Sequence, residues 1–205
     1  MNLDPFNQLQ LFGYEDYFDE LKNLYIENKL PNKILLNGKK GIGKCTFANH
    51  FINFILSNDE EDRYDDNNYL INSKNKSFKL IINRSSPNFF LVRPKEDKKN
   101  IEINQIRELI DFCNKSSFNN KPRFVIIDDI EYLNLNSSNA LLKILEEPND
   151  NINFILINNN KRVLPTLNSR CLNFKVFLTK DQSIRIINQL LNNDINTIIN
   201  NKLID

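Results

Sequence analysis

Residues 33–56 have the sequence KILLNGKKGIGKCTFANHFINFIL, which contains the strongest local indications of the fold. The apolar run at its start predicts a buried strand, and the amphipathic run at its end predicts a helix. Between them lies a match to G-x-x-x-x-G-K, the pattern of a phosphate-binding P-loop. Glycines allow successive backbone N–H groups to point at phosphate oxygens, and the N-terminal end of the helix adds positive charge. Four residues are therefore expected to hold phosphate: Gly38, Gly41, Gly43 and Lys44.

The residue after the P-loop lysine departs from the usual pattern. Cys45 stands where a Ser or Thr hydroxyl normally holds Mg²⁺, and a cysteine sulfur is a poor ligand for this hard cation. Thr46 does not simply replace that hydroxyl, because one further residue along a helix rotates a side chain by about 100°. We expect both residues to line a nucleotide site that binds ATP with Mg²⁺ only weakly.

Length, charge and cysteine content limit the possible classes of protein. With 205 residues the chain can hold one α/β domain and a small appendage, and its net charge of +1 leaves only local basic surfaces to attract nucleic acid. The widely spaced Cys45, Cys113 and Cys171 argue against a disulfide framework or a zinc site. His50, the only histidine, is expected to have a packing or surface role. Because no signal peptide or apolar run of bilayer length is present, we expect a cytoplasmic protein with no membrane partner.

Strands alternate with helices along the chain. Apolar runs predict further strands at 89–92, 123–129, 153–157 and 173–177. Periodic apolar residues predict helices at 14–28, 104–113, 137–147 and 182–191, with a helical turn at 164–167. Asn104 and Ser137 are the expected N-caps, and the acidic, then polar residues 57–77 predict a surface loop with room for a short helical piece. This alternation predicts an α/β fold in which helices cover both faces of a mostly parallel sheet.

Two carboxylates, Asp128 and Asp129, end the predicted strand at 123–129. Carboxylates often end strands as ordinary turn residues, but ligands of parallel sheets also bind at these strand ends. In P-loop NTPases an Asp there makes the Mg²⁺ contact, and we expect Asp128 to do so. Asp129 stands where a motor ATPase places a Glu to activate water. Because aspartate is one methylene shorter, and small misplacements of a catalytic group cost about a hundredfold, we expect binding without fast turnover.

Several stretches together resemble the clamp-loader branch of AAA+ proteins: GKKGIGKCT, VIIDDIEYLN, SSNALLKILEEP and the triplet Ser169-Arg170-Cys171. Within that branch the chain is most similar to the delta-prime group of bacterial DNA polymerase III subunits. The likeness extends from about Leu11 to Val176. It implies a RecA-like AAA+ core at residues 1–175 and a partial helical lid at residues 176–205, without the collar domain of the family.

The resemblance also implies roles for individual residues. Arg170 would be an arginine finger in trans that stabilises a transferring phosphoryl group on a neighbouring subunit. Without the resemblance, Arg170 would be interpreted as a surface residue in a salt bridge. Asn158 or Asn159 would be the sensor beside the γ-phosphate. The implied partners are the gamma/tau and delta subunits, and through them the sliding clamp and primed DNA. Many members carry a four-cysteine zinc module after the P-loop helix, but residues 57–86 contain no cysteine, so we expect no zinc.

Three functions remain open from the sequence. The first is a non-motor clamp-loader subunit that binds ATP weakly or not at all and supplies Arg170 in trans. The second is a catalytically active motor ATPase of the gamma/tau type, which the same P-loop would support. The third is a small P-loop kinase, which ranks last because no Arg-rich lid segment is recognisable. The side chain at position 45 separates the first two.

Overall fold

A sheet of five strands forms the centre of the computed structural model, which describes residues 4–95, 98, 100–116, 119–146 and 151–202. The strands are β1 (Lys33–Asn37), β2 (Phe89–Val92), β3 (Arg123–Ile127), β4 (Ile152–Asn158) and β5 (Leu172–Lys175). Their order in the sheet is β2-β3-β4-β1-β5, and every pairing is parallel. This confirms the predicted α/β fold with a parallel sheet, and it places β1, which leads into the P-loop, between β4 and β5.

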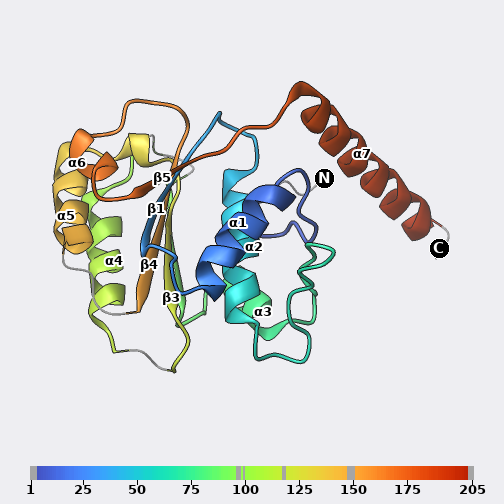
Figure 1. The fold of residues 1–205 in the computed structure, drawn as a ribbon, viewed down its shortest axis with the longest axis horizontal. Coiled ribbons are helices and arrows are strands. Elements are labelled where there is room, and N and C mark those ends of the chain that lie inside the picture. Colours follow the sequence, from blue (N-terminus) through green and yellow to red (C-terminus); the bar gives the residue numbers. More distant parts are fainter. Residues whose placement is uncertain (1–3, 96–97, 99, 117–118, 147–150, 203–205) are drawn as a thin grey trace.

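Helices cover both faces of the sheet (Figure 1). One face carries α1 (Glu15–Ile26), α2 (Lys44–Leu56) and α3 (Lys76–Ile82), and the other carries α4 (Ile103–Asn114), α5 (Leu135–Glu146) and α6 (Pro165–Asn168). A short 3₁₀ turn, η1 (Ile130–Tyr132), follows β3, and α7 (Lys180–Lys202) follows β5. None of the helices in the described part of the chain is long and apolar enough to cross a membrane.

Alternate residues of the strands reach opposite faces of the sheet. In β1, Ile34 and Leu36 join the apolar cluster beneath α1, α2 and α3, whereas Leu35 joins the cluster beneath α4 and α5. All three side chains are buried. Because both faces are covered, the strands appear in the sequence as continuous apolar runs rather than as alternating patterns.

The helix α7 packs against the start of the chain. It includes the predicted helix at 182–191 and continues to Lys202. In Figure 1 it extends away from the sheet, on the side that carries α1 and α2. Gly13 makes the contact possible, since a Cβ at this position would lie 2.7 Å from Cδ1 of Ile186.

Two helix starts differ from the predicted ones. Glu102, not Asn104, caps α4, in a capping box where the side chain of Gln105 accepts from the backbone N of Glu102 at 3.0 Å. At α5 the side chain of Asn134 accepts from the backbone N of Ser137 at 2.8 Å, so Ser137 lies inside the helix. In both cases a second polar residue two or three positions earlier competed for the cap. The predicted end of α5, at residue 147, lies outside the described residues.

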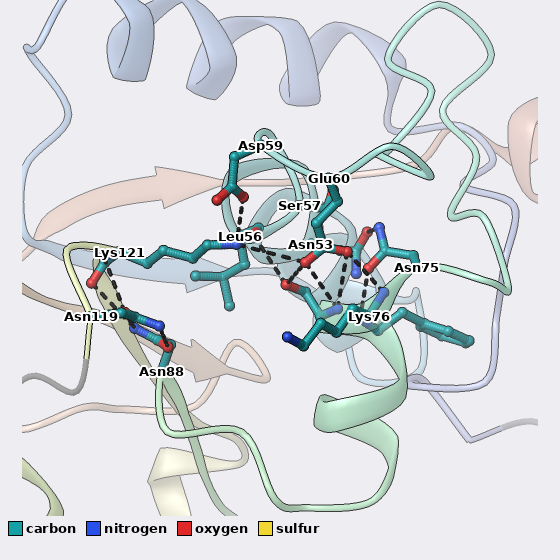
Figure 2. A network of polar contacts seen from close by, with 12 residues as sticks. Asn53, Leu56, Ser57, Asp59, Glu60, Asn75, Lys76, Asn88, Asn119 and Lys121 are labelled. Atoms are coloured by element: carbon teal, nitrogen blue, oxygen red, sulfur yellow. Dashed lines mark hydrogen bonds and ion pairs between the residues drawn. The ribbon is translucent and has the colours of Figure 1, made fainter.

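The loop between α2 and β2 is held by a polar network at the C-terminal end of α2 (Figure 2). The carbonyl oxygen of Leu56 accepts from Nζ of Lys121 at 2.7 Å and from Oγ of Ser77 at 3.0 Å. Lys121 also pairs with Asp59 at 2.5 Å. Asn75 caps α3, whereas the sequence analysis allowed only for a short helical piece within residues 57–77. These contacts tie the acidic loop to both α2 and the start of β3.

Candidate functional site

The P-loop joins β1 to α2 and uses its three glycines for different reasons. Gly41 and Gly43 have φ values of +79° and +95°, a backbone conformation that L side chains rarely adopt. A Cβ on Gly38 would instead lie 2.6 Å from the carbonyl oxygen of Val176, so only glycine allows this close approach to the segment after β5. The loop therefore has the backbone conformation that a phosphate cradle requires, directly before the N-terminus of α2.

Lys44, the first residue of α2, is buried and makes three hydrogen bonds within the protein. Its Nζ donates to the carbonyl oxygens of Gly38 at 3.1 Å and Lys39 at 2.7 Å, and to Oδ1 of Asn159 at 2.8 Å. Burial lowers the pKa of Lys44, although nearby carboxylates oppose this shift. Because an ammonium has three N–H groups, all of its donors are used, and a phosphate oxygen would have to displace one acceptor.

The two candidate sensor residues point in different directions. Asn158 is buried, and its Nδ2 donates to Oδ1 of Asn37 at 2.7 Å and to the carbonyl oxygen of Lys161 at 2.9 Å. Asn159 instead places its amide oxygen on Lys44. Successive side chains of a strand point to opposite sides, so only one of the two can face the P-loop. The structure brings Asn159, rather than Asn158, to this loop.

Glu131 lies in the same site and was not identified from the sequence. Asp129, with a left-handed φ of +57°, precedes η1, and this turn brings Glu131 to the end of β4. There Oε1 of Glu131 accepts from Nδ2 of Asn159 at 2.8 Å, and Oε2 accepts from the backbone N of Asn159 at 3.4 Å. Nδ2 of Asn159 also donates to Asp129, whose other oxygen lies 3.8 Å from Nζ of Lys40. The third acidic residue of DDIE was visible in the sequence, but the turn that aims it at Asn159 was not.

Cys45 and Asp128 face each other beside the P-loop. Burial, together with the neighbouring Asp129, raises the pKa of Asp128 to about 6, although a hydrogen bond from the thiol of Cys45 opposes the shift. Burial also raises the pKa of the Cys45 thiol well above its usual value. The pair offers one carboxylate and one neutral sulfur, which does not fit Mg²⁺. Among the residues that the structure describes, no group of three or more His, Cys, Asp and Glu could hold a metal ion.

A pocket of about 530 Å³ lies beside the P-loop, within the range of small-molecule sites. Residues 40–46, which include Thr46, form its polar end together with Asp128, Asp129 and Asn159. Leu11 and Phe12 from the start of the chain and Ile186 from α7 form an apolar end. Such a pocket suits a nucleotide, with phosphates on the loop and a base between the apolar side chains. The apolar end was not predicted, because it combines segments far apart in the sequence.

Arg170 lies apart from this pocket, after the short helix α6. Its Nη2 pairs with Oε1 of Glu146 at 2.6 Å, and its Nη1 donates to the carbonyl oxygen of Thr166 at 2.8 Å. About a third of its side chain, 33%, is exposed to solvent. Among the described residues that line the pocket, Arg170 is absent. Its guanidinium is therefore accessible from outside the chain while a surface carboxylate orients it.

The chain is similar to known DNA polymerase III subunits. The profile of the family described as "DNA polymerase III, delta subunit" matches residues 13–179. Over 138 residues the chain is 32% identical to DNA polymerase III subunit delta' of Pseudomonas aeruginosa, and this match covers 67% of this chain and 40% of that protein. Over 194 residues it is 32% identical to DNA polymerase III subunit gamma/tau of Mycoplasma genitalium, covering 93% of this chain and 30% of that protein. The chain thus spans less than half the length of these relatives.

A solved structure has a similar fold. The crystal structure of a DNA polymerase III gamma subunit-related protein from Thermotoga maritima superposes with a TM-score of 0.52 at 23% sequence identity. The match covers 80% of this chain and 47% of that chain. At this identity the likeness establishes the fold alone, and it confirms the α/β fold of the AAA+ type.

Proposed function

The chain belongs to the family of DNA polymerase III delta subunits, and from this membership we propose that it is a clamp-loader subunit of the delta-prime type. Such a subunit would assemble with gamma/tau and delta subunits and act through them on the sliding clamp and primed DNA, in the cytoplasm. Residues 1–175 would form its AAA+ core, and residues 176–205 part of its lid. The subunit would bind ATP weakly or not at all, and would supply Arg170 to a neighbouring nucleotide site.

The pair of Cys45 and Asp128 is the observation that carries the non-motor part of this proposal. A motor site needs an oxygen donor from the P-loop helix and an ionised carboxylate opposite it to organise Mg²⁺. Here the helix offers a buried thiol instead of a hydroxyl, and burial raises the pKa of the opposing Asp128 carboxyl to about 6. Asp129 would be a weak catalytic residue, since Asn159 and Lys40 already engage both of its oxygens. Nucleotide binding would therefore depend on the loop and Lys44 rather than on the metal.

The position of Arg170 supports a role in trans. The side chain is partly exposed and is held by one carboxylate and one carbonyl at the surface. A guanidinium in this setting can exchange Glu146 for the phosphate of a nucleotide on an adjacent subunit, where it would stabilise the transferring group. No movement of the core is needed for this exchange, because both present contacts are at the surface.

Co-purification tests the proposed assembly. The affinity-tagged full chain, expressed in its own host, should retain gamma/tau and delta subunits that mass spectrometry identifies in the eluate. A variant with the same tag and a disrupted P-loop strand, Leu35→Asp, serves as a control for non-specific capture. Recovery of the chain without either subunit, at low salt and native expression level, would contradict the role in a clamp loader.

The similarity to a gamma/tau subunit favours a second candidate, an active motor ATPase. This candidate predicts rapid Mg²⁺-dependent ATP hydrolysis by the purified chain. It also predicts that Cys45→Ser changes the affinity for Mg²⁺-ATP little, because the natural site would already be functional. The first candidate predicts negligible hydrolysis and a clear gain of affinity in the same variant.

A further inference from the structure

The ammonium of Lys44 is held by two kinds of acceptor. Two of its hydrogen bonds go to carbonyl oxygens of the P-loop itself, from Gly38 and Lys39. The third goes to the side chain of Asn159, which directly follows β4. A β/γ-phosphate that binds to Lys44 would take the place of this third acceptor, because the side chain can move while the loop carbonyls are part of the cradle. The strength of the Asn159 contact therefore sets how readily the lysine accepts phosphate.

The orientation of Asn159 is determined by acidic neighbours. A carboxylate accepts hydrogen bonds but donates none, so the amide nitrogen of Asn159 must face Glu131 and Asp129. The amide oxygen then points away from them, toward Lys44. Asp129 and Glu131 share this role, and the second oxygen of Glu131 also accepts from the backbone N of Asn159 at 3.4 Å.

The charges around Lys44 also oppose the binding of a phosphate. Three carboxylates, those of Asp128, Asp129 and Glu131, lie near enough to Lys44 to raise its pKa against the effect of burial. Lys40, an exposed basic residue of the loop, lies 3.8 Å from Asp129. An incoming triphosphate would therefore meet negative charge that these two lysines only partly offset.

We propose that Glu131 is a positioning residue that, through Asn159, keeps Lys44 bound within the protein and so weakens phosphate binding at the P-loop. This inference rests on the proposed function, because it gives the weak nucleotide binding a second physical cause besides Cys45. A role of Glu131 as a base that activates water is disfavoured by the contacts, since both of its oxygens accept from Asn159.

Equilibrium binding of ATP to the purified full chain tests the inference, first in EDTA and then in excess Mg²⁺. In EDTA the metal site cannot contribute, so the measurement reports on the loop and Lys44. Glu131→Gln retains the size of the side chain but removes its charge and one acceptor for Asn159. Asn159 would then be held by one carboxylate instead of two, and we expect the dissociation constant to fall about tenfold, which corresponds to about 1.4 kcal/mol. Glu20→Gln, at an exposed position of α1, is the matched control and should leave the dissociation constant unchanged.

A double-mutant cycle separates positioning from a general effect of charge. If Glu131 acts through Asn159, the gain from Glu131→Gln should disappear in an Asn159→Ala background. Thermal unfolding of each variant establishes that the fold is retained. A folded Glu131→Gln variant with unchanged or weaker ATP binding would overturn the inference, and so would a full gain in the Asn159→Ala background. If neither the natural chain nor Glu131→Gln binds ATP, the inference fails while the non-motor proposal stands. Rapid hydrolysis by the natural chain would refute the non-motor proposal. The ATP-binding measurements on Glu131→Gln would still decide the inference about Glu131.

Discussion

Acidification is expected to destabilise this protein through its only histidine, His50, which lies on α2 and has an exposure of 0%. Its Nε2 lies 3.2 Å from the carbonyl oxygen of Gln8, and its Nδ1 lies 3.0 Å from the hydroxyl of Tyr64. A carbonyl only accepts, so Nε2 carries the proton and Nδ1 accepts from the tyrosine. This arrangement suits the neutral imidazole, because a second proton on Nδ1 would force the tyrosine hydroxyl to act as the acceptor. Burial lowers the pKa of His50 to about 3, although the hydrogen bond to Gln8 opposes the shift.

The magnitude follows from the two pKa values. The unfolded chain binds a proton near pH 6.5, whereas the folded chain excludes it until about pH 3. The free energy of unfolding therefore falls as the pH falls below 6.5, and the loss stops only near pH 3. At pH 5 the loss from His50 is about 2 kcal/mol, and over the whole range it approaches about 5 kcal/mol.

Urea unfolding of the natural chain and of His50→Gln at pH 8, 7, 6 and 5 measures this contribution. Other titrating groups are common to both proteins, so their effects cancel in the difference. The variant should be the less stable protein at pH 8, because a buried pair of hydrogen bonds is altered, and the gap should narrow by about 2 kcal/mol at pH 5. A stability difference that stays constant with pH would show that the folded protein does not keep His50 neutral. NMR gives a second test, because a single histidine resonance that titrates near pH 6 in the folded protein is incompatible with a pKa of about 3.

Three further outcomes are expected. Cys45→Ser should tighten the binding of Mg²⁺-ATP by about tenfold, because a hard oxygen replaces a sulfur, while ATP binding in EDTA should stay the same. Titration calorimetry measures both affinities, and equal gains in the two conditions would show that the metal is not involved. Arg170→Ala should lower the ATPase rate of the assembled complex, by up to about a thousandfold at sites that border this chain, whereas the exposed Arg162→Ala should not; equal rates for both would remove the assigned role. Gly38→Ala should destabilise the fold by more than Gly41→Ala. A Cβ at position 38 would lie 2.6 Å from a backbone oxygen, whereas a Cβ at position 41 would meet no atom within 4 Å. The cost at position 41 is the left-handed backbone, about 1 kcal/mol. Thermal unfolding measures the difference, and the reverse order would contradict the steric argument.

The element pattern and the P-loop were predictable because they depend on neighbours in the sequence. The apolar run before Gly38, the helical pattern after Lys44 and the strand before Asp128 are each encoded by residues that are adjacent in the sequence. The helix caps were predicted less well, since Glu102 and Asn134 competed with nearby polar residues for the same role. A cap depends on one hydrogen bond, and several side chains near a helix start can supply it.

The P-loop between a buried strand and a helix, with Cys45 in place of a hydroxyl, could be recognised from the sequence because these features lie within one continuous stretch. The contact of Asn159, rather than Asn158, with Lys44 and the contact of Glu131 with Asn159 became visible only in the folded chain. Folding also brought α7 and the start of the chain together as the apolar end of the pocket. The physical reason is that the direction of a side chain at a strand end depends on the register of neighbouring strands and on the turn that follows. Those contacts join residues about 30 to 115 positions apart, which no local pattern encodes.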